Sequence, residues 1–273
     1  MNVAFDFGIS NTDIAVRTDD EINFFSMPTR QGNLSLVLIH EILAAYSLPQ
    51  SEINLIGVTG GKSSDLPDKL DSIPILKINE VDAIGLGAKV LYNITSEPTL
   101  VLSAGTGTAC VLVEGKNFNH LGGIAVGGGM LEGLGYLLFQ NSLGKEINEF
   151  ATHGARKELD ILIGDAVNSI GSLSPDITAV NFGKAKNASA DTMENTSAAL
   201  CNMVGEVIGT IAYLNALLIG SSRVCFLGRT SYLSEVTKGI NERLELAGIS
   251  GEYNDNREFG NVIGVIEQLK NHE

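Results

Sequence analysis

Two glycine clusters, a short hairpin apart between Ser103 and Gly135, constrain this chain more than any other feature. The first, Gly105-Thr106-Gly107-Thr108, follows the apolar run 100–102, so a tight turn after a strand can present N–H groups and two hydroxyls to an anion. The second, Gly127-Gly128-Gly129, precedes an apolar pattern of helical period and so puts a helix N-terminus there, where negative charge is favoured. One cluster alone is ordinary turn chemistry, but two in this order predict a clamp on nucleotide phosphates, with ATP the first ligand to consider.

Composition limits the partners of such a site. The chain has 273 residues, 44% of them hydrophobic, which suits one large domain or two lobes of ordinary size. A formal net charge of −14 makes a nucleic-acid backbone or an anionic membrane an unfavourable partner. An anionic ligand must therefore be held by local N–H groups, a metal ion or a few placed cations.

The sequence predicts no export signal. Its first residues, MNVAFDFG, contain neither a basic segment nor a long apolar one, and we expect the longest apolar segment, 204–219, to form a buried helix. The three cysteines are odd in number, widely separated and set in apolar runs, which favours reduced core thiols: Cys110, Cys201 and Cys225. We therefore expect a cytoplasmic protein without a membrane partner.

Strand and helix patterns recur in two halves. The first half predicts strands at 3–7, 14–18, 22–26 and 53–59 and helices at 34–46 and 80–92. The second predicts strands at 99–103 and 108–114, helical segments up to Gly220, a strand at 224–227 and helices at 232–246 and 259–269. This α/β order resembles the two-lobed actin-like ATPase (ribonuclease H-like) fold, with mixed sheets and flanking helices, of the actin-like and sugar-kinase superfamily. A boundary near Glu97-Pro98 would give an N-terminal lobe, 1–97, and a C-terminal lobe, 98–273, with the nucleotide loops.

The first strand ends in Asp6-Phe7-Gly8-Ile9-Ser10-Asn11-Thr12. A carboxylate followed by a glycine turn can hold a hydrated Mg²⁺ beside a phosphate-binding backbone. The segment resembles the first phosphate loop of that superfamily, D-x-G-x-T. The alternative is a β-hairpin whose aspartate and asparagine only cap the turn.

Another glycine turn, Thr59-Gly60-Gly61-Lys62-Ser63, follows a later strand. It is not a Walker A loop, because Ile56 stands where that motif needs glycine. We expect Thr59, Gly60 and Gly61 to line a substrate cleft by close backbone approach, with an ordinary strand-to-loop turn as the alternative.

Two carboxylates, Glu80 and Asp82, stand at the start of the helix predicted at 80–92. A carboxylate there can accept a proton from an alcohol poised for in-line attack on the γ-phosphate. Alternatively, both side chains only complement the helix dipole.

Together these segments resemble the type II pantothenate kinases over essentially the whole chain, most closely over 103–183. The matching motifs are Asp6-x-Gly8, Thr59-Gly60-Gly61, Glu80-x-Asp82-Ala83, Gly105-Thr106-Gly107-Thr108, Gly122-Gly123-Ile124, Gly127-Gly128-Gly129-Met130, Gly133-Leu134-Gly135-Tyr136-Leu137-Leu138, His153-Gly154 and Asp176-Ile177-Thr178-Ala179-x-Asn181-Phe182-Gly183. The resemblance implies phosphorylation of pantothenate to 4'-phosphopantothenate by ATP with Mg²⁺, the first step of coenzyme A biosynthesis, in a homodimer.

The resemblance also implies a role for each site residue. Glu80 would be the catalytic base, Asp6 would serve the metal, and the helix at 198–218 would build the dimer interface. The residues implied to bind ATP are Gly8, Ser10, Asn11, Thr12, Gly105, Thr106, Gly107, Thr108, Gly127, Gly128, Gly129 and Gly228. Those implied to bind the acceptor are Thr59, Gly60, Gly61, Asp82, His120, Gly122 and Gly123.

Besides Ser10, which stands where threonine is common in the first phosphate loop, three positions depart from the family pattern. His120 stands where the family usually has an arginine implicated in holding the pantothenate carboxylate, and an imidazole cannot form the bidentate fork of a guanidinium. Asp13 puts an anion where related kinases often have lysine, and Arg229 replaces a small residue. We therefore expect a weaker acceptor contact and a weaker first loop, whereas Arg229 could reach a ligand phosphate or lie in solvent.

Other functions stay open on the sequence. One is a kinase of the same fold for another small hydroxy compound, and another is a catalytically weak ATP-binding regulator, although the retained Glu80 favours catalysis. An activator ATPase that feeds electrons to a dehydratase would need paired cysteines for an iron–sulfur cluster, and the separated cysteines argue against it.

Overall fold

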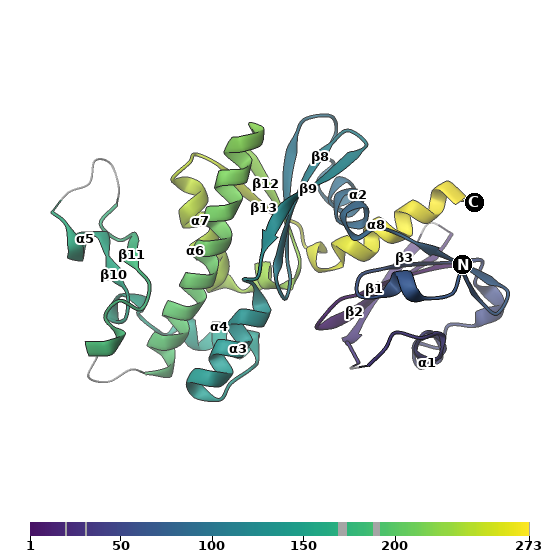
Figure 1. Cartoon of the computed structure of the whole chain (residues 1–273), viewed down its shortest axis with the longest axis horizontal. Coiled ribbons are helices and arrows are strands. Elements are labelled where there is room, and N and C mark those ends of the chain that lie inside the picture. Colours follow the sequence, from purple (N-terminus) through teal and green to yellow (C-terminus); the bar gives the residue numbers. More distant parts are fainter. Residues whose placement is uncertain (20, 31, 169–173, 188–191, 273) are drawn as a thin grey trace.

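The computed structural model describes residues 1–19, 21–30, 32–168, 174–187 and 192–272. Two lobes, each built on a mixed β-sheet, flank a central pair of helices, α2 (Glu80–Tyr92) and α8 (Gly260–Leu269) (Figure 1). This confirms the predicted two-lobed α/β fold with mixed sheets and flanking helices.

The first sheet has the strand order β3-β2-β1-β4-β6-β5. Its strands are β1 (Asn2–Phe7), β2 (Asn11–Thr18), β3 (Glu21–Pro28), β4 (Leu55–Thr59), β5 (Lys69–Leu70) and β6 (Ile73–Lys77). The first three pair antiparallel, and β4 and β6 continue the sheet in parallel with β1. Every residue of β1 is buried, because α1 (Leu36–Ala45) covers one face of the sheet and α8 the other.

The second sheet repeats this arrangement in the order β13-β12-β7-β8-β9. Its strands are β7 (Thr99–Ala104), β8 (Thr108–Glu114), β9 (Asn117–Ile124), β12 (Arg223–Leu227) and β13 (Ser250–Tyr253). Again three strands pair antiparallel and two continue in parallel, so β7 takes the place that β1 has in the first sheet. The sequence failed to predict β9 and β13, since these edge strands have no buried residue and therefore no apolar alternation.

The two central helices each pack on the sheet that is more distant in sequence. Helix α2 covers the second sheet, α8 returns to the first, and the two pack against each other. Their contact depends on glycine: a Cβ on Gly87 would lie 1.8 Å from the Gly260 carbonyl oxygen, and one on Gly264 1.9 Å from that of Ala83. The strands of the first sheet end at Lys77 and those of the second begin at Thr99, and the two helices tie the sheets together.

A methyl group at Gly87 should therefore weaken the protein. We expect Gly87→Ala to lower the free energy of unfolding by about 2 kcal/mol, because two backbones must move apart. The control is Gly133→Ala, at a helical glycine whose Cβ would meet nothing within 4 Å, which should change stability by no more than about 1 kcal/mol. Chemical denaturation measures both, and equal effects of the two substitutions would contradict the tight contact.

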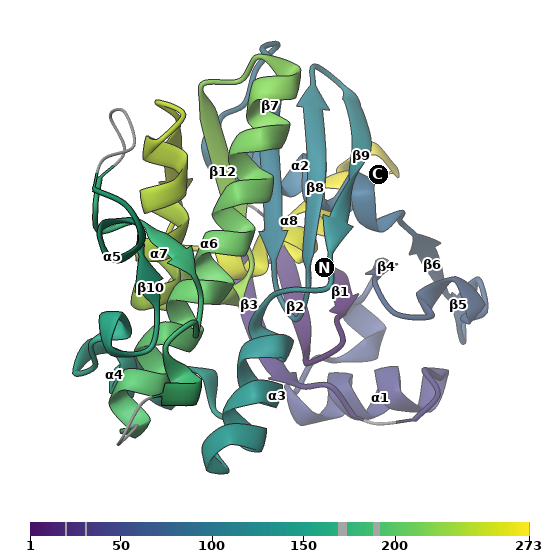
Figure 2. The ribbon, with the colours of Figure 1, turned by 60° about the vertical axis from the view of Figure 1, so that its left-hand side comes forward.

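The outer face of the second sheet is covered by helices (Figure 2). These are α3 (Gly128–Phe139), α4 (Gly144–Thr152), α6 (Met193–Ile219) and α7 (Ser234–Glu245). Length and composition would let α6 cross a membrane, yet residues such as Leu200, Val204 and Ile208 are buried in the core of the second lobe. The predicted buried helix is thus confirmed for one face only, because Val207, Leu214, Leu217 and Leu218 are exposed.

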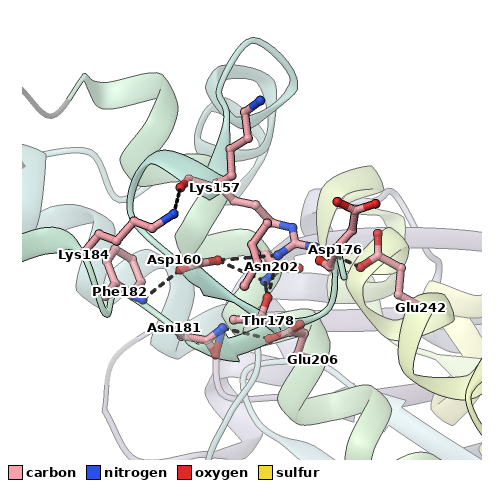
Figure 3. Close-up of polar contacts among 12 residues, drawn as sticks. Lys157, Asp160, Asp176, Thr178, Asn181, Phe182, Lys184, Asn202, Glu206 and Glu242 are labelled. Atoms are coloured by element: carbon pink, nitrogen blue, oxygen red, sulfur yellow. Dashed lines mark hydrogen bonds and ion pairs between the residues drawn. The ribbon is translucent and has the colours of Figure 1, made fainter. Parts of the chain in front are cut away.

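A small projection beside α6 carries β10 (Ile161–Leu162), α5 (Ile163–Ala166) and β11 (Thr178–Val180) (Figures 1 and 3). Polar contacts hold it to the helix. Asp160, fully buried, accepts hydrogen bonds from the Phe182 amide at 2.8 Å and from the Asn202 side chain at 3.4 Å. Asn181 donates to Glu206 of α6 at 2.8 Å. Burial raises the pKa of Asp160 to about 6. The contacts that hold the projection to α6 therefore include a buried carboxyl group that several hydrogen-bond donors stabilise.

Candidate active site

A cavity of about 720 Å³ is lined by residues of both lobes. Twelve residues with predicted roles line it: Asp6, Gly8, Ser10, Asn11, Glu80, Gly105, Thr106, Gly107, Thr108, Gly128, Gly129 and Gly228. The structure therefore brings the candidate base, the candidate metal residue and turns from both halves of the chain to one site.

The first glycine loop of one lobe contacts the first glycine loop of the other lobe. The hydroxyl of Ser10, in the turn between β1 and β2, lies 2.8 Å from that of Thr106, in the corresponding turn between β7 and β8. The equivalent places of β1 and β7 in their sheets explain this meeting, since both turns leave the same end of a central strand.

The second glycine cluster braces the first. The amide of Gly128 donates to the Gly105 carbonyl at 2.8 Å, and that of Gly129 donates to the Thr106 carbonyl at 3.0 Å. A Cβ on Gly127 would lie 2.7 Å from the Gly105 carbonyl oxygen, so the segments approach this closely only without side chains. Within the described ranges the amides of Thr106 and Gly107 donate no backbone hydrogen bond, which leaves donors in the first loop for an anion.

Asp6 lies at the bottom of the cleft, 8% exposed. Burial, followed by the charges of Asp13 and Glu80, raises its pKa to about 7, against a hydrogen bond from Asn261. Gly60 adopts a left-handed φ of +72°, and a Cβ there would lie 2.5 Å from the Asp6 carboxylate. The Thr59 turn therefore lies directly against Asp6.

The carboxylates of the cleft fit Mg²⁺ carried by a nucleotide. No group of three or more His, Cys, Asp or Glu that could hold a metal by itself occurs among the described residues. Mg²⁺ in phosphotransfer sites needs only one or two carboxylates beside waters and phosphates, and a cation near Asp6 would offset the repulsion from Asp13 and Glu80.

Glu80 is the first residue of α2 and is exposed to the cavity. The preceding Asn79 caps the helix, its side chain accepting a hydrogen bond from the Val81 amide at 2.8 Å. The backbone of Glu80 is thus fixed at a helix N-terminus, while its side chain extends into the cavity. This arrangement suits a proton acceptor close to the glycine loops.

Nine residues with predicted roles do not line the cavity: Thr12, Thr59, Gly60, Gly61, Asp82, His120, Gly122, Gly123 and Gly127. Thr12 is buried, with its hydroxyl 3.2 Å from that of Thr29. Thr59 is also buried and donates to the Ile78 carbonyl at 2.9 Å, just before α2 begins.

His120 lies on the edge strand β9, exposed and opposite Val111. The ladder shifts by one residue beyond it, where Gly122, with φ of +122°, faces Cys110. Such a bulge re-aims the following side chains. The same strand reaches α2, because a Cβ on Gly85 would lie 2.2 Å from the Phe118 ring. His120 therefore lies two residues along β9 from a side chain that contacts the helix of Glu80.

Asp13 and Arg229, two departures from the family pattern, pair with each other. The Arg229 fork donates to both Asp13 carboxylate oxygens, at 2.7 and 2.8 Å, and its Nε lies 3.2 Å from a Glu258 oxygen. Burial alone would lower the pKa of Arg229, but Asp13 and Glu258 hold it above its ordinary value. Arg229 therefore does not lie free in solvent.

Several cavity residues escaped sequence analysis. They are Ile9, Ser103, Ala109, Glu132, Gly144, Lys145, Asn148, Thr230, Tyr232, Leu233, Glu258 and Asn261. Those on α3, α4 and the segments after β12 lie outside the glycine motifs and carry no local motif of their own. Only the packing of α4 and α7 against α6 brings them to the cleft.

Solved structures with this fold bind ATP analogues. The chain aligns over 99% of its length, at a TM-score of 0.68 and 13% identity, with 96% of the ADPNP-bound activator of 2-hydroxyisocaproyl-CoA dehydratase from Clostridium difficile. It aligns equally fully, at a TM-score of 0.62 and 13% identity, with 99% of a ROK family glucokinase from Streptomyces griseus in complex with glucose and AMPPNP. These likenesses define the class, an α/β protein of the actin-like ATPase and sugar kinase fold.

Sequence relatives narrow the class to one family. The family model described as Fumble matches residues 89–239. A type II pantothenate kinase from Staphylococcus aureus strain USA300 is 30% identical over 226 residues, covering 80% of this chain and 84% of that protein. The chain belongs to the type II pantothenate kinase family, which confirms the resemblance of its motifs.

Proposed function

We propose that this protein phosphorylates pantothenate to 4'-phosphopantothenate at the expense of ATP, the first step of coenzyme A biosynthesis. The observation that carries the proposal is the single cavity that Glu80, Asp6 and the glycine loops of both lobes share in a chain of this family. A phosphotransferase with an alcohol acceptor needs these parts and little more.

Each part then has a defined task. The free amides of Thr106 and Gly107 and the hydroxyls of Ser10 and Thr106 bind phosphate oxygens. Mg²⁺, held beside Asp6, would neutralise charge that develops on the phosphates. Glu80 accepts the proton of the acceptor hydroxyl as the hydroxyl oxygen attacks the γ-phosphorus.

We propose the acceptor subsite beside α2, formed by the turn at Thr59-Gly60-Gly61, by Asp82 and by Gly122, Gly123 and His120 of β9. Two contacts support this placement. Thr59 donates a hydrogen bond to the Ile78 carbonyl, two residues before α2 begins, and Phe118 of β9 packs on α2. Both sides of the subsite therefore meet the helix that carries Glu80.

A guanidinium at position 120 should improve acceptor binding. We expect His120→Arg to lower KM for pantothenate about tenfold, because a charged bidentate hydrogen bond to a carboxylate replaces a weaker one. His40→Arg, at a half-buried histidine of α1 that does not line the cavity, serves as the control and should leave KM unchanged. If His120→Arg lowers turnover without lowering KM, the acceptor has no carboxylate at this position, which favours a different small hydroxy compound.

We also propose a cytoplasmic homodimer that binds neither nucleic acid nor membrane. The net charge of −14 supports a small ligand over nucleic acid. Leu214, Leu217 and Leu218 are exposed on α6 at the spacing of one helix face, which supports this helix as the contact between two copies. The three cysteines are all buried in the second lobe, which gives no support to an iron–sulfur activator.

Product analysis tests the function. Purified protein is incubated with Mg·ATP and, separately, pantothenate, other small hydroxy acids and sugars, and both ADP and product mass are measured. Phosphopantothenate formation at the highest kcat/KM of the panel is expected. A faster reaction with another acceptor would replace pantothenate by that compound, and ATP binding without product from any acceptor would favour a regulatory role.

A further inference from the structure

Arg229 crosses the cleft between the lobes. It follows β12 in the second lobe and reaches the first, where its terminal nitrogens bind Asp13 of β2 and the hydroxyl of Ser26 of β3, the latter at 2.9 Å. Its Nε pairs with Glu258, so all three nitrogens have protein partners.

The neighbours of Arg229 place this crossing beside the phosphate loop. A Cβ on Gly228 would lie 2.4 Å from the Ala104 carbonyl oxygen, and Thr230 donates to the Gly105 carbonyl at 2.7 Å. Both residues that flank Arg229 are thus fixed against the first glycine loop of the second lobe.

The partner of Arg229 is a carboxylate that would otherwise oppose nucleotide binding. Asp13 is directly opposite Asp6 in the β1–β2 ladder and is 5% exposed. The cavity lining holds more acidic than basic side chains: Asp6, Asp13, Glu80, Glu132 and Glu258 against Lys145 and Arg229. A buried Asp13 without a counter-charge would repel a polyphosphate strongly, because few water molecules screen it.

We propose that Arg229 is a positioning residue for ATP that acts by neutralising Asp13 across the cleft, and not by contacting the nucleotide. This inference rests on the proposed function only in taking ATP as the ligand. It distinguishes Arg229 from a phosphate-binding arginine, since its fork is already filled by protein oxygens.

A double-mutant cycle distinguishes neutralisation of Asp13 from direct binding of a phosphate by Arg229. Calorimetry with Mg·AMPPNP is performed on the parent, Arg229→Ala, Asp13→Asn and the double variant. We expect Arg229→Ala to weaken binding at least tenfold, because Asp13 is left buried and unpaired. The double variant should bind within about threefold of the parent, because the repulsive charge is gone. KM for pantothenate should change less than twofold in the three variants.

Other outcomes have distinct meanings. A double variant as weak as Arg229→Ala would overturn the inference, as would an Arg229→Ala protein that binds like the parent. A parent that does not bind AMPPNP contradicts the proposed function itself. Arg223→Ala is the matched control, since Arg223 is similarly exposed and pairs with Glu252 inside the second lobe at 3.1 Å. If Arg229→Ala does not fold, as judged by circular dichroism, Arg229→Gln takes its place in the cycle.

Discussion

Replacing Glu80 by glutamine should reduce turnover by about two to four orders of magnitude while leaving the affinity for ATP within a few-fold of the parent. The substitution keeps the size and the helix N-terminal position of the side chain and removes only its ability to accept a proton. Because Glu80 is exposed to the cavity and makes no hydrogen bond in the described structure that glutamine would break, the fold should be unaffected.

Three measurements define this result. Steady-state kinetics give kcat with pantothenate, calorimetry gives AMPPNP affinity, and denaturation gives stability. Glu114→Gln, at an exposed carboxylate beyond the end of the cleft, is the control and should match the parent.

Asp82→Asn should raise KM for the acceptor more than it lowers kcat. A loss of turnover in Asp82→Asn with near-normal Glu80→Gln would move the base to Asp82.

The sequence predicted the central parts of this fold well, because they have strong local signals. The core strand at 3–7 and the helix at 80–92 carry apolar patterns and clear boundaries, and the structure has both within one residue. Edge strand β9 has no such pattern, yet it carries His120, Gly122 and Gly123. The proposed acceptor subsite on this edge strand is therefore predictable only from family motifs.

Contacts between residues that are distant in sequence could not be predicted from local patterns. Asp13 and Arg229 are 216 residues apart. The sequence predicts a weaker first loop from Asp13 and leaves Arg229 open between a ligand phosphate and solvent. Their pairing depends on two sheets that bring β2 and the turn after β12 together, for which no motif exists. The same holds for the second glycine cluster, whose amides at Gly128 and Gly129 bind the first loop. A glycine motif indicates close approach of backbones, but not which partner is approached.

Replacing Asp6 by asparagine should abolish activity and at the same time stabilise the protein in metal-free buffer above pH 7. We expect an activity loss of about three orders of magnitude or more, because the substitution removes the carboxylate that we propose holds Mg²⁺ beside the phosphates. The stability gain follows from burial, which raises the pKa of Asp6 from 3.8 to about 7. Stability that the protonated carboxyl contributes is complete below pH 4 and is lost as the pH rises towards 7.

The two proteins should thus unfold alike near pH 4 and diverge above it. A shift of about three pKa units corresponds to about 4 kcal/mol in favour of Asp6→Asn at pH 8, since asparagine never ionises. Urea denaturation with chelator present, at pH 4.5, 6 and 8, measures this difference. Asp65→Asn, at an exposed carboxylate of the same lobe, should show no such divergence. A less stable Asp6→Asn at pH 8 would mean that the carboxylate is needed to hold the cleft together, and that Asp6 is structural before it is catalytic.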